Sequence, residues 1–176
     1  MSDAIRVGLV GYGYASKTFH APLISGTPGL ALTTVSSSDA AKVHADWPGA
    51  KVVSAAGELL NDPEIDLVVI ATPNDTHFPL AKAALEAGKH VVVDKPFTVT
   101  LSQARELDAL AKSLGRLLSV FHNRRWDSDF LTVKALINEG QLGEVCYFES
   151  HFDRFRPQVR QRWREQGGPG SGIWYD

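Results

Sequence analysis

A strand, a glycine turn and a helix start near the beginning of the chain constrain its fold most. The apolar run 5–10 is followed at once by Gly11 and Gly13, and the stretch 14–20 can begin a helix. Gly11 permits a tight turn, and Gly13 leaves no side chain between the backbone and a pyrophosphate. The free N–H groups and the dipole at the start of the helix attract such an anion. The pattern favours a dinucleotide-binding turn, although Ser16 replaces the usual third glycine and a merely flexible turn explains the two glycines equally well.

The composition excludes several classes of protein. With 176 residues, 44% of them hydrophobic, the chain can bury one good core and part of another. Its 18 basic and 20 acidic side chains give a net charge of −2, which provides no field to hold a nucleic acid or an anionic membrane. Cys146 is the single cysteine, the first residues lack a signal peptide, and the apolar run 67–71 is too short to span a bilayer. We expect a cytoplasmic protein without nucleic-acid or membrane partners.

Strand and helix patterns alternate along the first 123 residues. Pro22 is expected to kink or divide the first helix, and Thr100 with Gln103 resembles a capping box at the start of another. Six strands are predicted, at 5–10, 30–36, 52–53, 67–71, 89–96 and 117–121. The predicted fold class is therefore α/β, with a doubly wound parallel Rossmann sheet that forms a dinucleotide-binding domain over residues 1–123.

Polar loops follow the fourth and fifth strands. Ligands of an open α/β sheet lie beyond the carboxyl ends of the strands, so both loops should border the same crevice as the glycine turn. In the first loop, Thr76 is expected to cap the next helix, whereas helix capping and packing explain Asn74 and His77 better than ligand binding does. The second loop is expected to place Lys95 in the crevice. The alternative interpretation of a lysine at the end of a strand is a solvated surface charge.

Three serines, Ser36, Ser37 and Ser38, end the second strand. An acidic residue at this point would hold the 2′-hydroxyl of NAD, whereas small hydroxyl groups leave room for the 2′-phosphate of NADP. Lys42, one helical turn further, could supply a counter-charge. The serines therefore favour NADP slightly over NAD, although Asp39 is close and an ordinary loop is the alternative.

The remainder, 124–176, changes character. Asp127 or Ser128 is expected to cap a helix that ends at Gly140, and the stretch 145–153 alternates apolar and polar side chains as a half-buried strand does. We expect the incomplete start of a second α/β domain with an open sheet, used for substrate binding and oligomerisation. Five arginines within 154–164 fit either anion recognition or, preferably, a solvated loop or subunit contact.

Three motifs together resemble the glucose-fructose oxidoreductase, inositol dehydrogenase and MocA (Gfo/Idh/MocA) family. They are Gly-Tyr-Gly at 11–13, Ala-Thr-Pro-Asn-x-x-His at 71–77 and Gly-Lys-His-Val-x-x-Asp-Lys-Pro at 88–96. Their order covers essentially the whole chain, which is similar to the front half of such a protein. The resemblance implies an NAD(P)-dependent oxidoreductase of a small polar substrate such as a sugar or polyol, and an open sheet that favours a homo-oligomer.

The resemblance also implies particular site residues. Lys95 matches the family's active-site lysine, with Asp94 replacing the usual glutamate, and the Lys95–Pro96 bond is expected to be cis. Asp176 matches the acid of an Asp-x-Gly-x-His segment, and a chain that ended there would lack the histidine. No metal ligands are predicted. The expected catalytic residues are Lys95 and Asp176, and the expected cofactor-binding residues are Gly11, Tyr12, Gly13, Tyr14, Ala15, Ser16, Ser36, Ser37, Ser38, Thr72, Pro73, Asn74, His77, Asp94, Lys95, Pro96, Asn123, Arg124 and Arg125.

Three functions compete on this evidence. Hydride transfer is the chemistry of the nicotinamide, so the protein must orient an alcohol or carbonyl and exchange its proton, which an ammonium on Lys95 can do. The second reading is an NAD(P)-binding regulator, or an inactive truncated fragment, favoured by the missing histidine. The third is a glycoside hydrolase that uses NAD transiently. The Asp-Lys-Pro strand end argues against a methyltransferase that shares the glycine turn.

Overall fold

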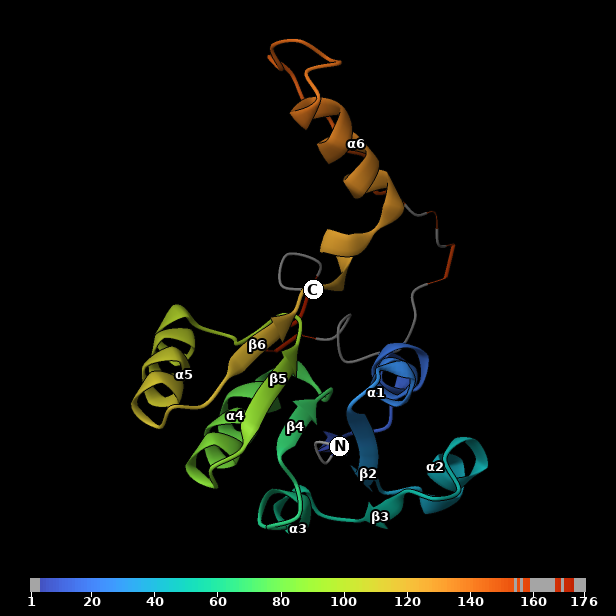
Figure 1. The fold of residues 1–176 in the computed structure, drawn as a ribbon, viewed down its shortest axis with the longest axis vertical. Coiled ribbons are helices and arrows are strands. Elements are labelled where there is room, and N and C mark those ends of the chain that lie inside the picture. The colour runs from blue at the N-terminus through green and yellow to red at the C-terminus, as the bar shows by residue number, and fades with distance from the viewer. Residues whose placement is uncertain (1–3, 154, 156, 159–166, 169, 173–176) are drawn as a thin grey trace.

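The computed structural model describes residues 4–153, 155, 157–158, 167–168 and 170–172. Its centre is a six-stranded parallel sheet in the order β3-β2-β1-β4-β5-β6. The strands are β1 (Ile5–Val10), β2 (Leu30–Ser36), β3 (Lys51–Val53), β4 (Leu67–Ile70), β5 (His90–Asp94) and β6 (Leu118–Phe121). The reversal of strand order at β1 confirms the doubly wound α/β prediction, which Figure 1 shows from one side.

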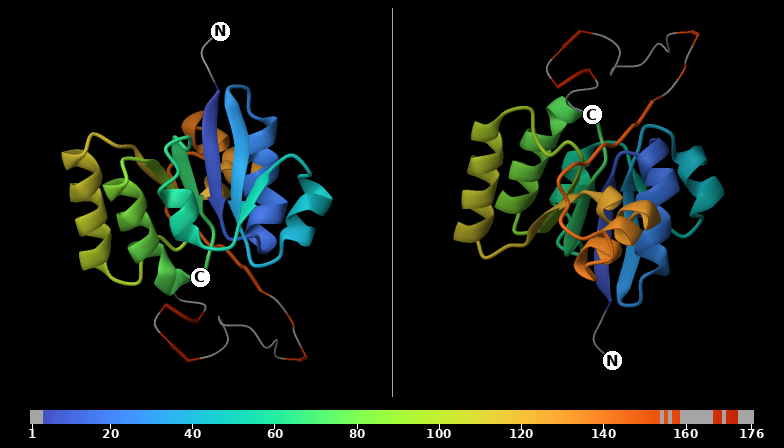
Figure 2. Two further views of the ribbon diagram at one scale, coloured as in Figure 1. Left: turned by 90° about the horizontal axis from the view of Figure 1, so that it is seen from below. Right: turned by 90° about the horizontal axis from the view of Figure 1, so that it is seen from above.

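Helices cover both faces of the sheet (Figure 2). A helical segment runs through a π-helical turn, Ser16–His20, into α1 (Ala21–Gly26), which lies with α2 (Ala40–Asp46) on one face. The other face carries α3 (Ala56–Leu60), α4 (His77–Glu86) and α5 (Leu101–Ser113). Neighbouring residues of β4 point to opposite faces, since Val68 and Ile70 pack with α4 and α5 while Val69 packs with α1. Each face therefore has its own apolar core.

Proline and capping residues set the helix boundaries largely as the sequence predicts. Pro22 is the second residue of α1, and the N–H of Ala21 donates to the carbonyl of Ser16, so the helix changes from π to α geometry at the proline. The reciprocal hydrogen bonds between Thr100 and Gln103 confirm the capping box. Thr76 does not cap α4, because its hydroxyl donates instead to the carbonyl of Pro73 at 2.6 Å within the 3-10 turn Asn74–Thr76.

The carboxyl ends of the central strands stand at one level. Val10 is in register with Ser36 on one side and with Ile70 on the other, and Ile70 is in register with Val93. The loops that follow β1, β2, β4 and β5 therefore leave the sheet along the same edge.

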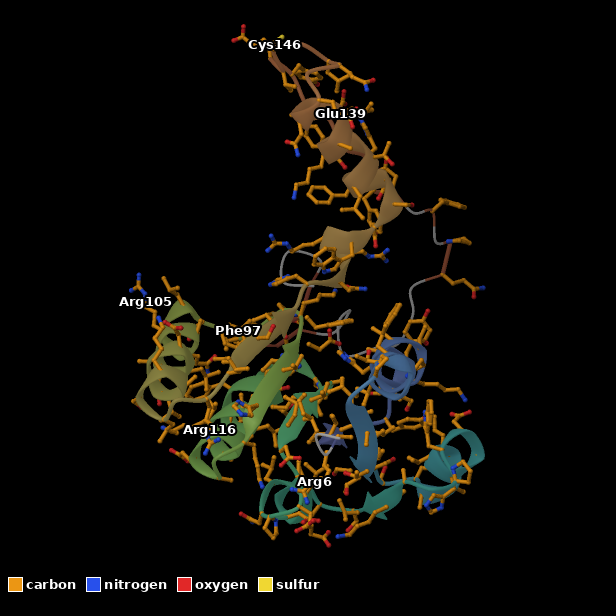
Figure 3. The ribbon with its side chains drawn as sticks, viewed as in Figure 1. Arg6, Phe97, Arg105, Arg116, Glu139 and Cys146 are labelled. Carbon is orange, nitrogen blue, oxygen red and sulfur yellow. The ribbon has the colours of Figure 1, made fainter. Side chains whose placement is uncertain are left out.

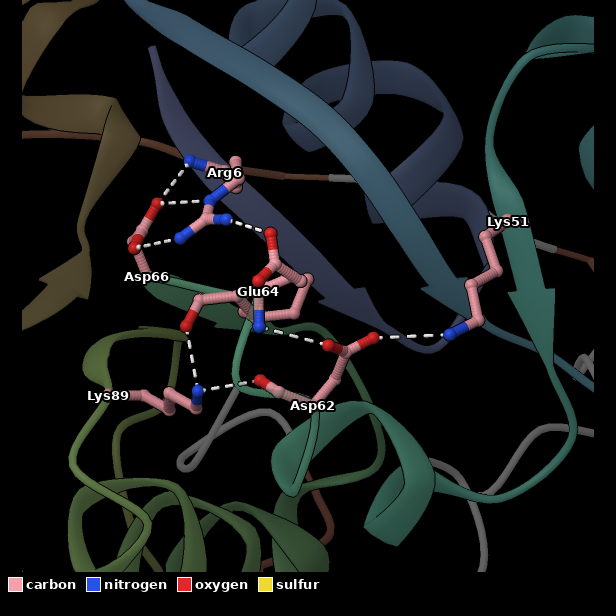
Figure 4. A network of polar contacts seen from close by, with 7 residues as sticks. Arg6, Lys51, Asp62, Glu64, Asp66 and Lys89 are labelled. Carbon is pink, nitrogen blue, oxygen red and sulfur yellow. Dashed lines mark hydrogen bonds and ion pairs between the residues drawn. The ribbon is translucent and has the colours of Figure 1, made fainter. Parts of the chain in front are cut away.

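The opposite, amino edge is closed by a network of charged side chains (Figure 4). Arg6 donates to Asp66 Oδ2 through Nε at 3.0 Å and to Asp66 Oδ1 at 3.1 Å, and it also pairs with Glu64. Lys89, 7% exposed, donates to the carbonyl oxygens of Asp62 and Ile65 at 2.7 and 2.8 Å. These contacts fix the loop before β4 against β1 and β5.

The segment after β6 lies beyond the sheet. A 3-10 turn, Asn123–Trp126, leads into α6 (Ser128–Asn138), which projects away from the other helices in Figure 1 and keeps Phe130 and Ile137 at 49% and 41% exposure. Figure 3 places Cys146 at the outer end of this projection, exposed and free.

The prediction of a strand at 145–153 is wrong, since this stretch has no regular secondary structure. A strand needs a neighbour for its hydrogen bonds, and all six strands in the described part of the chain belong to the first sheet. Asp127 precedes α6 but does not cap it, since its carboxylate pairs with Arg124 at 2.9 Å. No helix in the described ranges is long and apolar enough to cross a membrane.

Candidate dinucleotide site

The glycine turn after β1 has the geometry that the sequence predicts. Gly11 has a φ of +89°, and a Cβ atom built there would lie 2.7 Å from the carbonyl oxygen of Ala71. Only glycine satisfies both restrictions without strain. A Cβ atom at Gly13 would meet nothing within 4 Å, so the backbone there is open to an approaching group. The two glycines thus differ in purpose, one closing the turn on β4 and the other leaving its surface bare.

Ser16 closes the turn from inside. Its side chain is fully buried, and its hydroxyl donates to the carbonyl of Gly11 at 2.8 Å. The hydroxyl is therefore used within the turn, and the residue that replaces the third glycine stabilises the loop instead of facing a ligand. Beside it, Ala15 is half-buried and Tyr14 is 78% exposed.

A cleft of about 480 Å³ opens at the carboxyl edge, between the loops after β1, β2 and β4. It brings together predicted residues from three separate loops. Sequence reasoning missed Ser54, Ala56 and Leu80 as lining residues, although their places just after β3 and on α4 would have indicated them once the strand order was known. The lining residues are Val10, Gly11, Tyr12, Ser36, Ser37, Ser38, Asp39, Lys42, Ser54, Ala56, Thr72, Pro73, Thr76 and Leu80.

The side chain of Tyr12 leaves the cleft and enters the core beneath α2. It is 6% exposed, and its hydroxyl donates to Asp46 at 2.9 Å. Burial, followed by the hydrogen bond to Asp46, raises the pKa of Tyr12 to about 12, which keeps the phenol protonated as the donor. Tyr12 can therefore offer its backbone to a ligand in the cleft, while its ring anchors the turn to α2.

The serines at the end of β2 form the far wall of the cleft. Ser36 is 6% exposed, and the N–H of Ser37 donates to the carbonyl of Val53 at 2.9 Å. Asp39 caps α2 by accepting the backbone N–H of Lys42 at 3.0 Å, so one of its oxygens is already used. The ammonium of Lys42 donates to the carbonyl oxygen of Tyr12 at 3.1 Å and so lies at the glycine turn.

His77 links the loops after β4 and β5. The side chain is 1% exposed, with Nδ1 2.8 Å from the carbonyl oxygen of Pro96 and Nε2 2.9 Å from that of Thr72. Both ring nitrogens thus face backbone, which matches the packing alternative for this residue. Asn74, also 1% exposed, donates its side-chain amide to the carbonyl of Gly170 at 2.9 Å, while its Oδ1 has no hydrogen-bond partner among the residues that the structure describes.

The end of β5 carries Asp94, Lys95 and Pro96, and the Lys95–Pro96 bond is cis as predicted. Asp94 Oδ1 accepts the N–H of Lys95 at 2.8 Å, and its other oxygen lies 3.7 Å from Nε2 of the buried His20. Burial raises the pKa of Asp94, but the nearby imidazole of His20 and the N–H of Lys95 outweigh this effect, so the pKa is lowered on balance. A carboxylate is therefore held directly before Lys95, and sequence reasoning missed the contribution of His20.

The other predicted site residues lie further along the chain. Asn123 is half-buried after β6, and Arg124 and Arg125 are exposed on the same 3-10 turn. Asp176 and the five arginines within 154–164 lie outside the described residues. Among the described residues, no three His, Cys, Asp or Glu side chains are grouped to hold a metal ion.

The geometry is that of a phosphate-binding turn joined to a polar cleft. Bare backbone at Gly13, the three serines after β2 and a lysine suit an anionic ligand with ribose hydroxyls, and an amine at the end of β5 suits proton exchange. These features lie along one edge of the sheet, because β1 and β5 are separated only by β4.

Comparisons with known proteins agree with this architecture. The profile of a family described as "Oxidoreductase family, NAD-binding Rossmann fold" matches residues 5–122, and that of a "C-terminal alpha/beta domain" matches residues 134–176. The chain is 83% identical over its whole length to the uncharacterized oxidoreductase YdgJ of Escherichia coli, covering 51% of that protein. It is 42% identical over 99% of its length to scyllo-inositol 2-dehydrogenase (NADP(+)) IolW of Bacillus subtilis, covering 49% of it.

Solved structures give the same relationship. The YPO2259 protein from Yersinia pestis superimposes with a TM-score of 0.93 and 74% identity, over 99% of this chain and 49% of that one. A biliverdin reductase from Synechocystis, solved with biliverdin and NADP+, gives a TM-score of 0.70 and 37% identity over 80% of this chain and 44% of that one. The chain thus spans about half the length of the relatives that it matches.

Proposed function

The chain belongs to the Gfo/Idh/MocA oxidoreductase family, and on this premise we propose that it is an NAD(P)-dependent oxidoreductase. It transfers a hydride between the nicotinamide and a hydroxyl or carbonyl of a small polar substrate, a sugar or polyol. The observation that carries the proposal is the single cleft that joins the glycine turn after β1 to the serines after β2 and the Thr72–Pro73 loop after β4.

The preferred cofactor is NADP. The backbone of residues 11–16 holds the pyrophosphate, since Gly13 is open and the following helix presents its first N–H groups. Ser36, Ser37 and Ser38 surround the adenine ribose, where their small side chains leave room for a 2′-phosphate beside Lys42. Thr72, Pro73, Asn74 and His77 border the nicotinamide half, together with 94–96 and 123–125. The NADP dependence stated in the name of the Bacillus relative supports this preference.

Lys95 is the catalytic proton donor and acceptor. The bound nicotinamide supplies the hydride, and the chain must place the reacting oxygen of the substrate and exchange its proton. The ammonium of Lys95 polarises a carbonyl oxygen and gives it a proton in reduction, and the neutral amine takes the proton back in oxidation. Asp94 accepts the N–H of Lys95 and so fixes the backbone from which this amine extends. Asp176 is the second proposed acid–base residue.

A small hydroxylated substrate fits the relatives. IolW is named for scyllo-inositol, a polyol, and its sequence is similar over 99% of this chain. We place the cofactor domain at 1–123 and the start of the substrate domain at 124–176, a division that the match of the C-terminal family profile to residues 134–176 supports.

Cofactor binding is tested by titrating the chain with NADPH and NADH while following nicotinamide fluorescence. Tight binding with a preference for NADPH is expected, and absence of binding to either coenzyme overturns the proposal. A preference for NADH would reject only the role given to the serines.

Turnover is tested by nicotinamide absorbance with a panel of polyols, sugars and aldehydes. In a preparation that turns over, Lys95→Ala should keep cofactor affinity and lower kcat by roughly a hundredfold, the usual acid–base contribution. Cofactor binding without turnover on any substrate would instead indicate a regulator, and release of sugar without net NADH would indicate a glycoside hydrolase.

A further inference from the structure

Helix α2 contains a lysine and an aspartate at ion-pair spacing that do not pair with each other in the structure. Lys42 and Asp46 are four residues apart, the spacing at which opposite charges on a helix normally pair. The carboxylate of Asp46 is instead contacted by two groups from the segment after β1. Lys17 Nζ lies 2.8 Å from Oδ2 and 3.0 Å from Oδ1, and the hydroxyl of Tyr12 donates to Oδ2 at 2.9 Å.

Lys42 is thereby left to another partner. Its ammonium donates to the carbonyl oxygen of Tyr12 at 3.1 Å and lies 5.9 Å from the centre of the Tyr12 ring. The carbonyl oxygen and the ring both belong to Tyr12 of the glycine turn. Lys42 also lines the cleft together with Ser36, Ser37 and Ser38. Among the described lining residues, Lys42 therefore carries the only positive charge, and Asp39 carries the only negative charge.

The competing carboxylates are both occupied. Lys17 and then Tyr12 lower the pKa of Asp46, so the group is an anion already compensated by a cation and a hydroxyl. Asp39 accepts the backbone N–H of Lys42 at 3.0 Å and caps α2. Without Lys17, the nearest cation that could compensate Asp46 is Lys42 itself, one turn earlier on the same helix.

We propose that Lys17 and Tyr12 are positioning residues for cofactor specificity, which keep the ammonium of Lys42 in the cleft for the 2′-phosphate of NADP. Lys17 and Tyr12 satisfy Asp46, and a satisfied Asp46 does not draw Lys42 out of the cleft. This inference rests on the proposed preference for NADP. It assigns part of the specificity to two residues, Lys17 and Tyr12, whose side chains contact Asp46 and not the phosphate.

The test uses binding and does not depend on turnover. Calorimetric titration of the chain with 2′,5′-ADP and with 5′-AMP gives an affinity ratio that reports the 2′-phosphate contact alone. Lys42→Met should reduce this ratio by about tenfold or more, the scale of one charge-assisted contact. Lys17→Met should reduce it by a similar amount, because Asp46 then captures Lys42.

Two further variants separate positioning from a general loss of positive charge. Asp46→Asn alone should leave the affinity ratio near that of the unaltered chain. Added to Lys17→Met, it should return the lowered ratio of that variant to the unaltered value. A simple charge effect is additive and would make Asp46→Asn alone raise the ratio. Tyr12→Phe changes no charge and keeps the buried ring, so a decrease in the ratio there would support positioning directly.

The possible failures are distinguishable. If the unaltered chain binds neither adenosine ligand, the proposed function is wrong. If it binds both equally, the preference for NADP is wrong and the inference falls with it. If Lys42→Met lowers the ratio while Lys17→Met and Tyr12→Phe do not, NADP binding stands and the positioning network is overturned. Thermal unfolding of each variant confirms that the fold is retained.

Discussion

The amino and carboxyl edges of the same sheet use polar groups differently. At the amino edge, Arg6 and Lys89 meet carboxylates and carbonyls of the loop before β4, so charges of this loop are compensated by the protein itself. At the carboxyl edge, Ser16 donates to the backbone of its own loop, and His77 contacts backbone carbonyls of the loops after β4 and β5. A cleft stays open at this edge between the loops after β1, β2 and β4. Three buried side-chain polar atoms lack a hydrogen-bond partner among the described residues, and two of them belong to this edge. They are Asn74 Oδ1 and His20 Nε2, which lies 3.7 Å from an Asp94 oxygen.

This difference between the two edges suggests that the amino edge serves stability and the carboxyl edge serves binding. Buried polar groups are normally satisfied, so the two unsatisfied atoms support the proposal that a cofactor binds at this edge. Substitutions at the amino edge should alter unfolding and leave cofactor affinity unchanged, whereas those at the carboxyl edge should alter affinity or both.

Gly11→Ala should have the largest effect, because it should lower both the stability of the fold and the affinity for NADPH. The φ of +89° is strained for alanine, and its Cβ atom would meet the carbonyl oxygen of Ala71 at 2.7 Å. We expect a destabilisation of about 3 kcal/mol with loss of NADPH binding. Urea unfolding and fluorescence titration measure the two effects.

Gly13→Ala is the matched control for that substitution. Its Cβ atom would meet no protein atom within 4 Å, so unfolding should change by less than about 0.5 kcal/mol. NADPH affinity should nevertheless fall, since the methyl group occupies the approach of the pyrophosphate. Unchanged affinity would show that the cofactor does not touch the turn at this residue.

His77→Ala should destabilise the protein by about 2 kcal/mol, because it creates a cavity and leaves the carbonyls of Thr72 and Pro96 without their shared partner. Cofactor affinity should fall as well, since both loops border the proposed nicotinamide region. Urea unfolding and NADPH titration test this. A variant of normal stability that had lost only affinity would indicate direct contact with the cofactor instead.

Asp66→Asn should produce a smaller, pH-dependent effect confined to the amino edge. Hydrogen bonds from the Arg6 side chain and backbone lower the pKa of Asp66 to about 2 from 3.8. A lowered pKa stabilises the fold fully above the unfolded value, and this contribution disappears as the pH falls from about 4 to about 2.

Both side chains of this pair are 38% exposed, so solvent screening limits the effect at pH 7 to about 1 kcal/mol. Urea unfolding from pH 7 to pH 2 should show the variant and the unaltered chain converging at low pH, with equal NADPH affinity at pH 7. Curves that remain parallel would mean that the charge of Asp66 is not the cause.

Glu64→Gln should have the smallest effect. Glu64 pairs with Arg6, but its side chain is 75% exposed, and exposed pairs contribute roughly 0.5 kcal/mol or less. A large loss of stability in urea unfolding would show that the whole network acts as one unit.

Much of this architecture could be predicted from local patterns. Short apolar strands, the capping box at Thr100 and the break at Pro22 depend on neighbours in sequence, and all appear in the structure. The prediction of a strand at 145–153 was wrong because a strand also depends on residues far away in the sequence. Alternating apolar and polar side chains form a strand only when a neighbouring strand supplies the hydrogen bonds.

The sequence by itself determined the glycine turn, the order of strands and helices, and which loops carry polar side chains. The tertiary structure alone decided what those side chains do. Tyr12 turned into the core, His77 joined two loops, and Asp46 paired with Lys17 instead of Lys42. The reason is physical: backbone preferences act over a few residues, whereas the partner of a charge or a buried hydroxyl is whichever group the packed sheet brings within about 3 Å.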